Sequence, residues 1–199
     1  MPSTPQPVAG PVPAWAWQAR QPGVPPQAQA QAWLETRLAG EEGPVTMQRD
    51  ARGRPLLCTP RGCHDCNWSH SGEGLLVALG EHVAVGIDME RLRPRPRALA
   101  VAARYFTPGE ADWLATQAAG DDRDLAFLRL WCAKEAVLKA HGHGLSFGLH
   151  RLRFEDAGGG LVLRDCDPAL GLARDWHLRE LVPSPGYIGA LAWRPRVAG

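Results

Sequence analysis

The chain has 199 residues, a formal net charge of +1 and 45% apolar residues. This length suits one domain or two small halves that share a core, and the near-zero charge argues against a protein that mainly coats nucleic acid. No apolar run approaches the roughly 20 residues that span a bilayer, and the N-terminus lacks the basic start and apolar stretch of a signal peptide. We therefore expect a cytoplasmic protein with no membrane or nucleic-acid partner.

The first third of the chain predicts an extended lead-in followed by a helix and short strands. Residues 1 to about 30 are rich in Pro, Ala and Gln, which is typical of extended or mobile segments. A helix is expected over 28–39, where Gly40 ends the pattern. Strands are expected at 45–49 and directly after the turn at Gly53.

Five cysteines are an odd number, which argues against a disulfide framework in a reducing compartment. Three of them crowd together with two histidines, as Cys58, Cys63, His64, Cys66 and His70. A structural zinc site needs four ligands, and this cluster offers one Cys-x-x-Cys without a second pair at the usual distance. The spacing leaves zinc open but favours free thiols on a loop.

Two apolar runs, 75–79 and 83–89, are separated by Gly80-Glu-His, which predicts a β-hairpin. Further along, Thr107 is expected to cap a helix that begins at Pro108, with Glu110 completing a capping box. That pattern alone explains Thr107 and Glu110, so a structural role is favoured for both.

A longer helix is predicted over 124–140, ended by Gly142. Its apolar face is expected to include Leu125, Leu128, Trp131 and Leu138. Strands are then expected at 149–155, 161–164, 176–182 and 187–193, and the three glycines of 158–160 predict a hairpin turn. The fold class that follows is α+β, with a helix and strands in each half.

Three carboxylates and two lysines, Lys134 and Lys139, form a pattern that suits phosphate chemistry. Asp88 and Glu90 share one face of a predicted strand, because side chains alternate with a period of two. Glu135 and Lys139 stack at i, i+4 on the long helix. Oxygen ligands beside an ammonium group suit a hard divalent cation that holds phosphates. Each pair alone also has an ordinary explanation, a solvated strand edge or a surface ion pair.

Ser69 and His70 lie just before the first of the two apolar runs, where a hydroxyl and an imidazole are suitable phosphate donors. A Ser-His hydrolase is not favoured. Adjacent residues on one strand point to opposite faces, which prevents contact between a nucleophile and its base.

Five motifs in this order resemble the 4′-phosphopantetheinyl transferase superfamily. They are Gly53-Arg54-Pro55, Asn67-Trp-Ser69-His70-Ser71, Val85-Gly-Ile-Asp88-Met-Glu90, Phe106-Thr-x-x-Glu110 and Trp131-x-x-Lys134-Glu135-Ala-x-x-Lys139-x-x-Gly-x-Gly144-Leu. The length is similar to that of the monomeric branch of this family. The resemblance implies a pseudo-two-fold pair of similar α+β halves, 1–84 and 85–199, with the active site in the cleft between them.

The resemblance also implies an activity and its residues. The reaction transfers 4′-phosphopantetheine from coenzyme A to a serine of an apo acyl, peptidyl or polyketide carrier protein, and releases adenosine 3′,5′-bisphosphate. The implied metal is Mg²⁺, with Mn²⁺ as an alternative, and its implied ligands are Asp88, Glu90 and Glu135. The implied coenzyme A contacts are Arg54, Ser69, His70, Lys134 and Lys139. Glu135 is the expected base, and Lys139 is expected to neutralise charge on the phosphate.

A basic run follows Glu90 directly and consists of Arg91, Arg93, Arg95 and Arg97. Prolines between the last three arginines hold the run extended. In this family the carrier partners are typically acidic around the modified serine, so the run is expected to steer their approach. A solvated basic loop is the alternative.

Two other functions remain open at this point. A metal-dependent phosphoesterase would use the same carboxylates to activate water. A non-catalytic protein that binds coenzyme A or a carrier would have no need of Glu135 as a base, so the intact acidic motifs argue against it.

Overall fold

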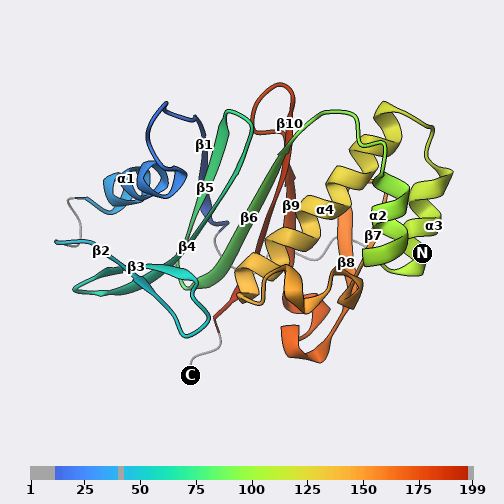
Figure 1. The fold of residues 1–199 in the computed structure, drawn as a ribbon. Coiled ribbons are helices and arrows are strands. Elements are labelled where there is room, and N and C mark those ends of the chain that lie inside the picture. Colours follow the sequence, from blue (N-terminus) through green and yellow to red (C-terminus); the bar gives the residue numbers. More distant parts are fainter. Residues whose placement is uncertain (1–11, 40–42, 197–199) are drawn as a thin grey trace.

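The structure is a computed structural model that describes residues 12–39 and 43–196. Its strands form antiparallel sheets, with one helix on one side of the central strands and the other helices on the other side (Figure 1). The mixed α+β class expected from the sequence is confirmed. Across the described ranges, no helix combines the length and the apolar character needed to cross a bilayer.

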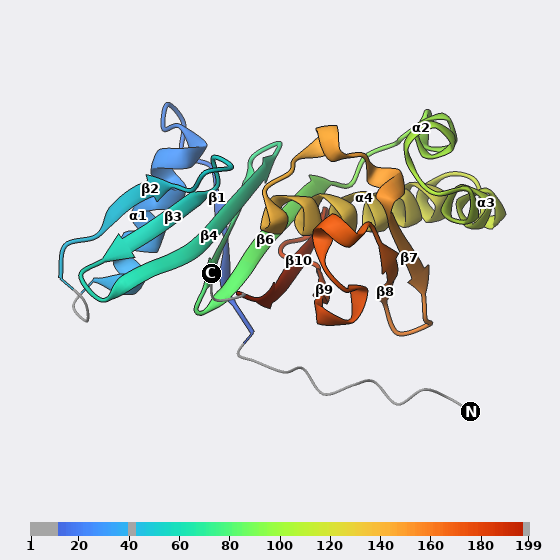
Figure 2. The same ribbon diagram turned by 90° about the horizontal axis from the view of Figure 1, so that it is seen from below.

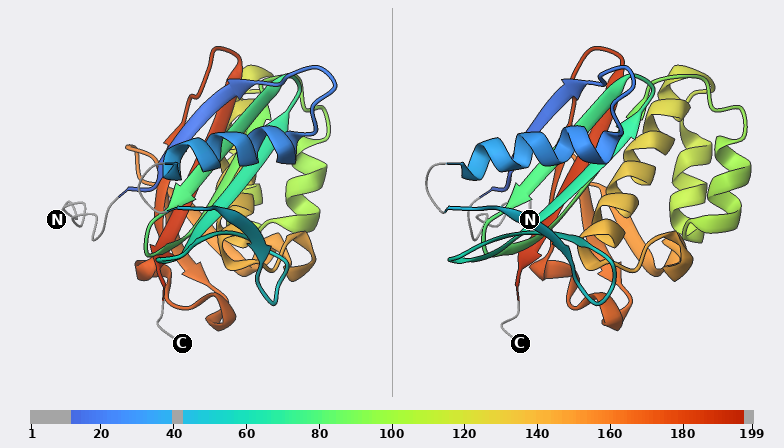
Figure 3. Two further views of the ribbon diagram at one scale, coloured as in Figure 1. Left: turned by 90° about the vertical axis from the view of Figure 1, so that its left-hand side faces the viewer. Right: turned by 60° about the vertical axis from the view of Figure 1, so that its left-hand side comes forward.

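The N-terminal part is a five-stranded sheet covered by one helix. Its strand order is β1-β5-β4-β3-β2, and its elements are β1 (Ala14–Ala19), α1 (Pro26–Leu38), β2 (Thr46–Arg49), β3 (Pro55–Thr59), β4 (Gly62–Ser71) and β5 (Gly74–Gly80). The helix α1 lies across one face of this sheet (Figure 3). Leu34 packs there against Leu57, Leu75 and Val77, so a small apolar core holds the helix in place.

The expectation of an extended or mobile lead-in to about residue 30 is wrong for the part that the structure describes. Residues 1–11 lie outside the described ranges, but β1 pairs with β5 over its full length and α1 begins at Pro26. Trp15 and Trp17 pack against the apolar cluster that β6 and β10 build. The Pro, Ala and Gln content concealed a strand whose large residues alternate with small ones.

The C-terminal part combines a second sheet, a hairpin and several helices. The sheet has the order β6-β10-β9, and the hairpin is β7-β8. The elements are β6 (Val83–Arg91), α2 (Ala98–Tyr105), α3 (Pro108–Thr116), α4 (Asp121–His141), two 3-10 turns (Leu145–Phe147 and Leu149–Arg151), β7 (Leu152–Asp156), β8 (Leu161–Cys166), two further 3-10 turns (Pro168–Leu170 and Ala173–Asp175), β9 (His177–Leu181) and β10 (Tyr187–Pro195).

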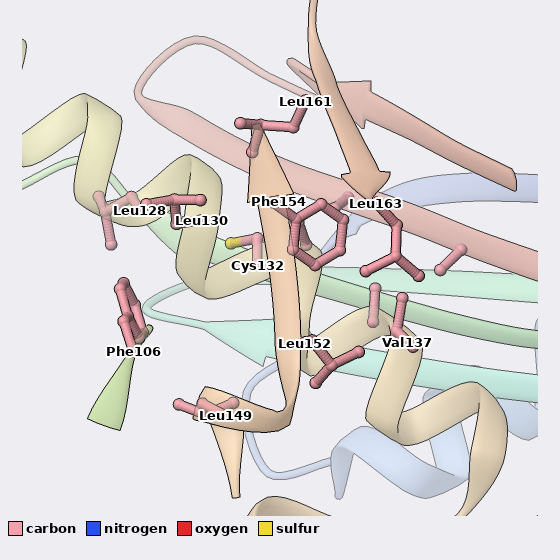
Figure 4. Close-up of a cluster of buried hydrophobic side chains, with 14 of the residues drawn as sticks. Phe106, Leu128, Leu130, Cys132, Val137, Leu149, Leu152, Phe154, Leu161 and Leu163 are labelled. Atoms are coloured by element: carbon pink, nitrogen blue, oxygen red, sulfur yellow. The ribbon is translucent and has the colours of Figure 1, made fainter. Parts of the chain in front are cut away.

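The long helix α4 organises this part of the molecule. It runs from α2 and α3 toward β6, and β7 and β8 cover another of its sides (Figure 2). Its buried face packs against Phe154 and Leu163 of the hairpin and against Phe106 (Figure 4). The rings of Phe106 and Phe127 stack with centroids 5.5 Å apart. This core fixes the position of α4 over β6.

Local signals predicted several of these elements correctly. The helix expected over 124–140 is α4, and Gly142 ends it in the left-handed region at φ = 87°. Thr107 and Glu110 form the expected capping box, and the glycine turn joins β7 to β8. Leu125, however, is 40% exposed, so it does not belong to the apolar face. The start of the strand expected at 149 is a 3-10 turn.

The hairpin expected between 75–79 and 83–89 is wrong. These runs are β5 and β6, and they belong to different sheets. Both edges of β5 are already paired, with β1 and β4, while β6 pairs with β10. The turn between β5 and β6 therefore carries the chain from one sheet to the next.

The two sheets meet where β4 faces β6, and side chains make the contact. Asp65 Oδ2 accepts a hydrogen bond from Val85 N at 3.2 Å, and Asn67 Oδ1 accepts one from Ile87 N at 3.0 Å. Ser71 Oγ accepts from the backbone N of the last β6 residue at 3.1 Å. Three alternate residues of β4 thus bond the free backbone edge of β6, and the fourth, Ser69, bonds the side chain of Asp88. We call this contact, formed by positions 65, 67, 69 and 71 of β4, the β4–β6 seam.

The cysteines differ from the sequence-based expectation. Residues 62–71 form a strand instead of a loop, and Cys58 and Cys63 face each other across β3 and β4 as a disulfide with a Cα–Cα distance of 4.0 Å. Cys66 is a buried free thiol. Within residues 12–39 and 43–196, no group of three or more His, Cys, Asp or Glu residues is arranged to hold a metal, so the zinc alternative gains no support.

Candidate functional site

The candidate site lies where β6, the end of β4 and the second half of α4 come together. Gly86 makes this approach possible, because a Cβ at that position would lie 2.0 Å from Ala136 O and 2.4 Å from Ala140 N. The helix therefore rests directly on the strand. Asp88 lies two residues after Gly86 on β6, and Glu135 lies one residue before Ala136 on α4. The close approach of the strand and the helix therefore brings these two side chains to the same place.

Asp88 is held by two donors. Lys139 Nζ and Ser69 Oγ each donate to Asp88 Oδ1 at 2.7 Å, and Lys139 also donates to Ile87 O at 3.2 Å. The side chain of Asp88 is buried, and its second oxygen, Oδ2, has no hydrogen-bond partner in the described structure. One carboxylate oxygen is thus fully engaged, while the other is buried without a hydrogen-bond partner in the described structure.

Glu135 is a second carboxylate with a buried, unpaired oxygen. It is 7% exposed, and its buried Oε1 has no hydrogen-bond partner in the described structure. Burial, together with the neighbouring charge of Asp88, raises the pKa of Glu135 to about 7, although the Lys139 ammonium acts in the opposite direction. Glu135 therefore titrates in the range where a general base is most effective.

Glu90 shares a face of β6 with Asp88, as the strand period predicted, but it has other partners. Ser71 Oγ donates to Glu90 Oε2 at 3.0 Å, and Arg95 Nη2 donates to the same oxygen at 2.7 Å. The side chain is only partly buried. Glu90 is thus held at one end of the group by a cation from the basic run.

The donor set fits a hard cation. Two buried carboxylate oxygens without hydrogen bonds, on Asp88 and Glu135, are costly unless a ligand pairs with them. Carboxylate oxygens are the ligands that Mg²⁺ prefers. In the described structure, however, the three carboxylates do not form a preassembled metal cluster.

Lys134 does not join this group. Its ammonium is completely buried, lies 2.7 Å from Glu110 Oε2 and donates to the carbonyl oxygens of Leu149 and Leu152. Burial lowers the pKa of Lys134 to about 8, against the effect of Glu110. Because consecutive residues on a helix are about 100° apart, Lys134 and Glu135 face different sides of α4. The expected phosphate contact from Lys134 is therefore not available in this structure.

The other expected coenzyme A contacts are dispersed. Ser69 belongs to the group through Asp88, whereas His70 is exposed on the opposite face of β4. Arg54 forms an ion pair with Asp65 and packs against the backbone at Gly142, beyond the end of α4. Arg54 thus lies at the far end of the helix segment that carries Glu135.

The structure adds two residues that sequence reasoning did not place in the site. Ser71 supports Glu90, and the signal for it in the sequence is the period of two that links it to Ser69 on β4. Glu110 was assigned a capping role only, yet it also holds Lys134 and accepts from Phe154 N at 2.8 Å. No local signal reveals that second role, because both partners are distant in the sequence.

The chain also contains a Gly-x-Ser-x-Gly sequence, at 144–148, which in hydrolases forms a nucleophile elbow between a strand and a helix. Here it forms a 3-10 turn that follows the C-terminal end of α4 in the chain, and Ser146 Oγ donates to His143 O at 3.3 Å. This geometry does not support a serine hydrolase.

Comparison with known proteins places the chain among enzymes of one kind. Residues 84–192 match the family described as ACPS, 4′-phosphopantetheinyl transferase superfamily. The chain is 32% identical over 167 residues to 4′-phosphopantetheinyl transferase HetI of Nostoc sp.. This alignment covers 80% of this chain and 67% of HetI. It is 40% identical over 133 residues to a putative 4′-phosphopantetheinyl transferase, slr0495, of Synechocystis sp., covering 64% of this chain and 52% of that protein.

A third relative is 4′-phosphopantetheinyl transferase psf-1 of Bacillus pumilus, 34% identical over 105 residues. That alignment covers 53% of this chain and 43% of psf-1. The aligned regions therefore span between 43% and 67% of these three relatives. The region shared with the family contains Asp88, Glu90, Glu135 and Lys139.

Proposed function

Because the chain belongs to the 4′-phosphopantetheinyl transferase superfamily, we propose that it transfers 4′-phosphopantetheine from coenzyme A to a serine of an apo carrier protein. The observation that carries the proposal is the meeting of Asp88, Lys139 and Glu135 where α4 rests on β6. An ammonium group beside two buried carboxylate oxygens without hydrogen bonds is suited to a phosphate and its counter-ion.

In the proposed reaction, the serine hydroxyl of the carrier attacks the β-phosphate of coenzyme A. A new phosphorus–oxygen bond forms to the serine, and the bond to the leaving adenosine 3′,5′-bisphosphate breaks. Glu135 accepts the serine proton, which its pKa of about 7 allows at neutral pH. Lys139 neutralises negative charge that develops on the phosphate.

We propose Mg²⁺ as the metal, held by Asp88, Glu135 and Glu90. The two orphan carboxylate oxygens support the first two ligands. When bound, the ion would supply Lewis-acid polarisation of the phosphate oxygens. Glu90 would have to exchange its bond with Arg95 for the ion.

We propose that coenzyme A lies along the boundary between the two parts of the molecule. This is supported by the origin of the site residues, since Ser69 comes from β4 while Asp88 and Lys139 come from β6 and α4. A division of the chain into 1–84 and 85–199 as similar halves rests on the sequence resemblance. Lys134 and His70 are not needed by this placement.

The basic run is proposed as the approach surface for the carrier. Arg93, Arg95 and Arg97 line a cavity of about 390 Å³ that Glu90 borders, and Trp131 forms part of its apolar wall. An acidic carrier would be attracted to this rim by charge complementarity. Because this cavity lies beside Glu90, a carrier bound there would bring its serine toward Glu135, the proposed base.

The direct test is to incubate the purified protein with coenzyme A, Mg²⁺ and a panel of apo carriers, and to measure carrier mass with and without a chelator. A chelator-sensitive mass gain with the wild type, lost in Glu135→Gln, supports the proposal. Coenzyme A that binds without any mass gain would favour the non-catalytic alternative. Cleavage of coenzyme A without a carrier would favour the phosphoesterase. The proposals of a monomer and of a cytoplasmic location rest on sequence alone, and sedimentation of the same sample tests the first.

A further inference from the structure

The last residue of β4, Ser71, links the β4–β6 seam to the candidate site. Ser69 and Ser71 lie two positions apart on β4, as Asp88 and Glu90 do on β6, so each pair shares one face of its strand. Ser69 Oγ donates to Asp88 Oδ1 at 2.7 Å, and Ser71 Oγ donates to Glu90 Oε2 at 3.0 Å. Two serines thus bond two of the three carboxylates that are proposed to hold the metal.

The hydrogen bonds of Ser71 have a defined direction. A serine hydroxyl has one proton to donate, while its oxygen can accept further bonds. The backbone N of Arg91 donates to Ser71 Oγ at 3.1 Å, so the hydroxyl proton is left for Glu90. This direction fits a carboxylate, which accepts hydrogen bonds and donates none.

Glu90 needs such a support because it lies near the end of its strand. Its side chain is only partly buried, and β6 ends at the next residue, Arg91. A long side chain that must be ordered when a ligand binds lowers the affinity for that ligand. A partner that holds the side chain beforehand avoids this loss.

The two donors on Glu90 Oε2 differ in charge. Arg95 Nη2, at 2.7 Å, brings a guanidinium group, which repels a metal ion and competes with it for the carboxylate. Ser71 brings a neutral donor from a strand that is paired along its length with β5. The Ser71 bond can therefore persist when a cation binds Glu90, whereas the Arg95 bond is weakened.

We propose that Ser71 is a positioning residue of the metal site, whose hydroxyl group holds Glu90 in place for the ion. Ser71 acts through Glu90 and takes no part in the chemical step. The inference rests on the proposed function, because that function supplies the metal. Hydrogen-bond partners of metal ligands orient those ligands, and the loss of one typically lowers metal affinity by about tenfold or more.

Ser71 also closes the end of the β4–β6 seam through its bond with Arg91 N. A role limited to this bond would change the stability of the fold without involving Glu90. The proposed role adds a dependence of metal affinity on the hydroxyl group. That dependence should vanish once position 90 no longer carries a carboxylate, so stability and metal affinity are measured separately.

An isosteric pair of variants tests the proposal. Ser71→Thr keeps the hydroxyl group and Ser71→Val replaces it with a methyl group, and both β-branched side chains suit a strand. Titration of the coenzyme A complex with Mn²⁺ and Mg²⁺ should give Ser71→Thr an affinity within about twofold of wild type and Ser71→Val an affinity about tenfold lower. Ser184→Ala, in the turn between β9 and β10, is the control and should bind the metal as wild type does. Equal affinities of the Thr and Val variants would overturn the proposal.

A double-variant cycle shows whether Ser71 acts through Glu90. In a Glu90→Gln background, Ser71→Thr and Ser71→Val should bind Mn²⁺ with affinities within about twofold of each other. A tenfold difference in that background would place the action of the hydroxyl elsewhere and overturn the proposal. Denaturant unfolding of the metal-free proteins shows that each variant is folded under the titration conditions. If Ser71→Val does not fold, Ser71→Ala removes the hydroxyl group without adding bulk and takes its place.

Carrier modification by wild type, measured in parallel, separates this proposal from the proposed function. Metal affinity that depends on the hydroxyl group, without any transfer, would contradict the proposed function and support the role of Ser71. Transfer by wild type, with equal metal affinities of the Thr and Val variants, would contradict the role of Ser71 alone. If the wild-type complex with coenzyme A bound no metal, the proposed metal site and the role of Ser71 would both be wrong.

Discussion

Arg95 Nη2 lies 2.7 Å from Glu90 Oε2, so an arginine of the basic run holds a carboxylate that is proposed to bind the metal. The backbone N of Arg95 also donates to Asp124 Oδ2 at 3.0 Å, which ties the run to the start of α4. The Arg95 guanidinium thus takes the place that the proposed metal ion would have on Glu90. Metal binding through Glu90 and the position of the basic run are therefore coupled.

Removing the guanidinium should strengthen metal binding. We expect Arg95→Gln to raise the Mg²⁺ affinity of the coenzyme A complex by up to about fivefold, because an ion pair whose side chains are about a fifth exposed contributes 1 kcal/mol or less. Titration calorimetry with Mg²⁺ or Mn²⁺ measures this. Arg93→Gln removes the same charge from an exposed position nearby and should have no such effect. A lower affinity in Arg95→Gln alone would show that Arg95 supports the metal site.

Glu135→Gln should reduce transfer by at least about 100-fold, the usual contribution of a general base. In the wild type, turnover should fall at acid pH, because Glu135 must be ionised to accept a proton, and saturating Mg²⁺ should move this fall to a pH below the value of about 7 for the metal-free carboxyl. Carrier mass measured at short times gives the rate. Glu155→Gln, at an exposed site on β7, is the control. Full activity in Glu135→Gln would remove the residue from the role of base.

The same carboxyl should make stability depend on pH. Burial raises the pKa of Glu135 from 4.5 to about 7, so its favourable contribution is complete below 4.5 and is lost as the pH rises through 7. Relative to wild type, Glu135→Gln should therefore gain stability by about 3 kcal/mol between pH 4.5 and pH 8. Denaturant unfolding of the metal-free proteins measures the difference. A constant difference across this range would contradict the assigned shift.

Lys134 should matter for stability and not for coenzyme A. Lys134→Met leaves Glu110 buried without its cation, which should cost about 3–5 kcal/mol. Adding Glu110→Gln should restore part of that loss, because no buried charge then remains unpaired. Denaturant unfolding compares the variants, and calorimetry of the folded double variant should give an unchanged coenzyme A affinity. A large fall in that affinity would return Lys134 to the binding site.

The basic run should act on the rate of encounter with the carrier. Neutralising Arg91, Arg93 and Arg97 together should slow association at low salt and flatten its salt dependence, while turnover at saturating carrier stays the same. Stopped-flow measurements at several ionic strengths test this. The control neutralises Arg20, Arg37 and Arg61, which are exposed in the N-terminal part. Equal effects of the two triple variants would indicate a general charge effect and no docking surface.

The features that sequence predicted well depend on neighbouring residues. Thr107, Pro108 and Glu110 form a helix start within four positions, and Gly142 ends α4 through its own backbone conformation. The contact between Asp88 and Lys139 was not predicted, because the sequence stacks Lys139 with Glu135 and only the resemblance to a family brought the strand and the helix together. Given that placement, the i, i+4 spacing of Glu135 and Lys139 predicted the correct face of the helix. The i, i+2 spacing of Asp88 and Glu90 predicted the correct face of the strand.

The features that sequence missed depend on distant partners. A turn between two apolar runs looks the same whether the runs pair or enter different sheets, so the occupied edges of β5 decided the outcome. From the sequence, Lys134 was expected to bind phosphate. In the structure its ammonium is enclosed by Glu110 of α3 and by the carbonyl oxygen of Leu152 in β7. The partner of Cys58 likewise depended on the register of β3 and β4.

The β4–β6 seam has a consequence for how this chain can change in evolution. An ordinary pair of strands is joined by backbone groups, which are alike at every position, so many substitutions leave the pairing intact. Here the two strands are joined by the side chains of Asp65 and Asn67, which must accept hydrogen bonds from Val85 N and Ile87 N. Inserting one residue before position 65 would turn Cys66, Trp68 and His70 toward β6 instead, leaving its edge unsatisfied and Asp88 without Ser69. Length changes in β4 should therefore be tolerated only in steps of two.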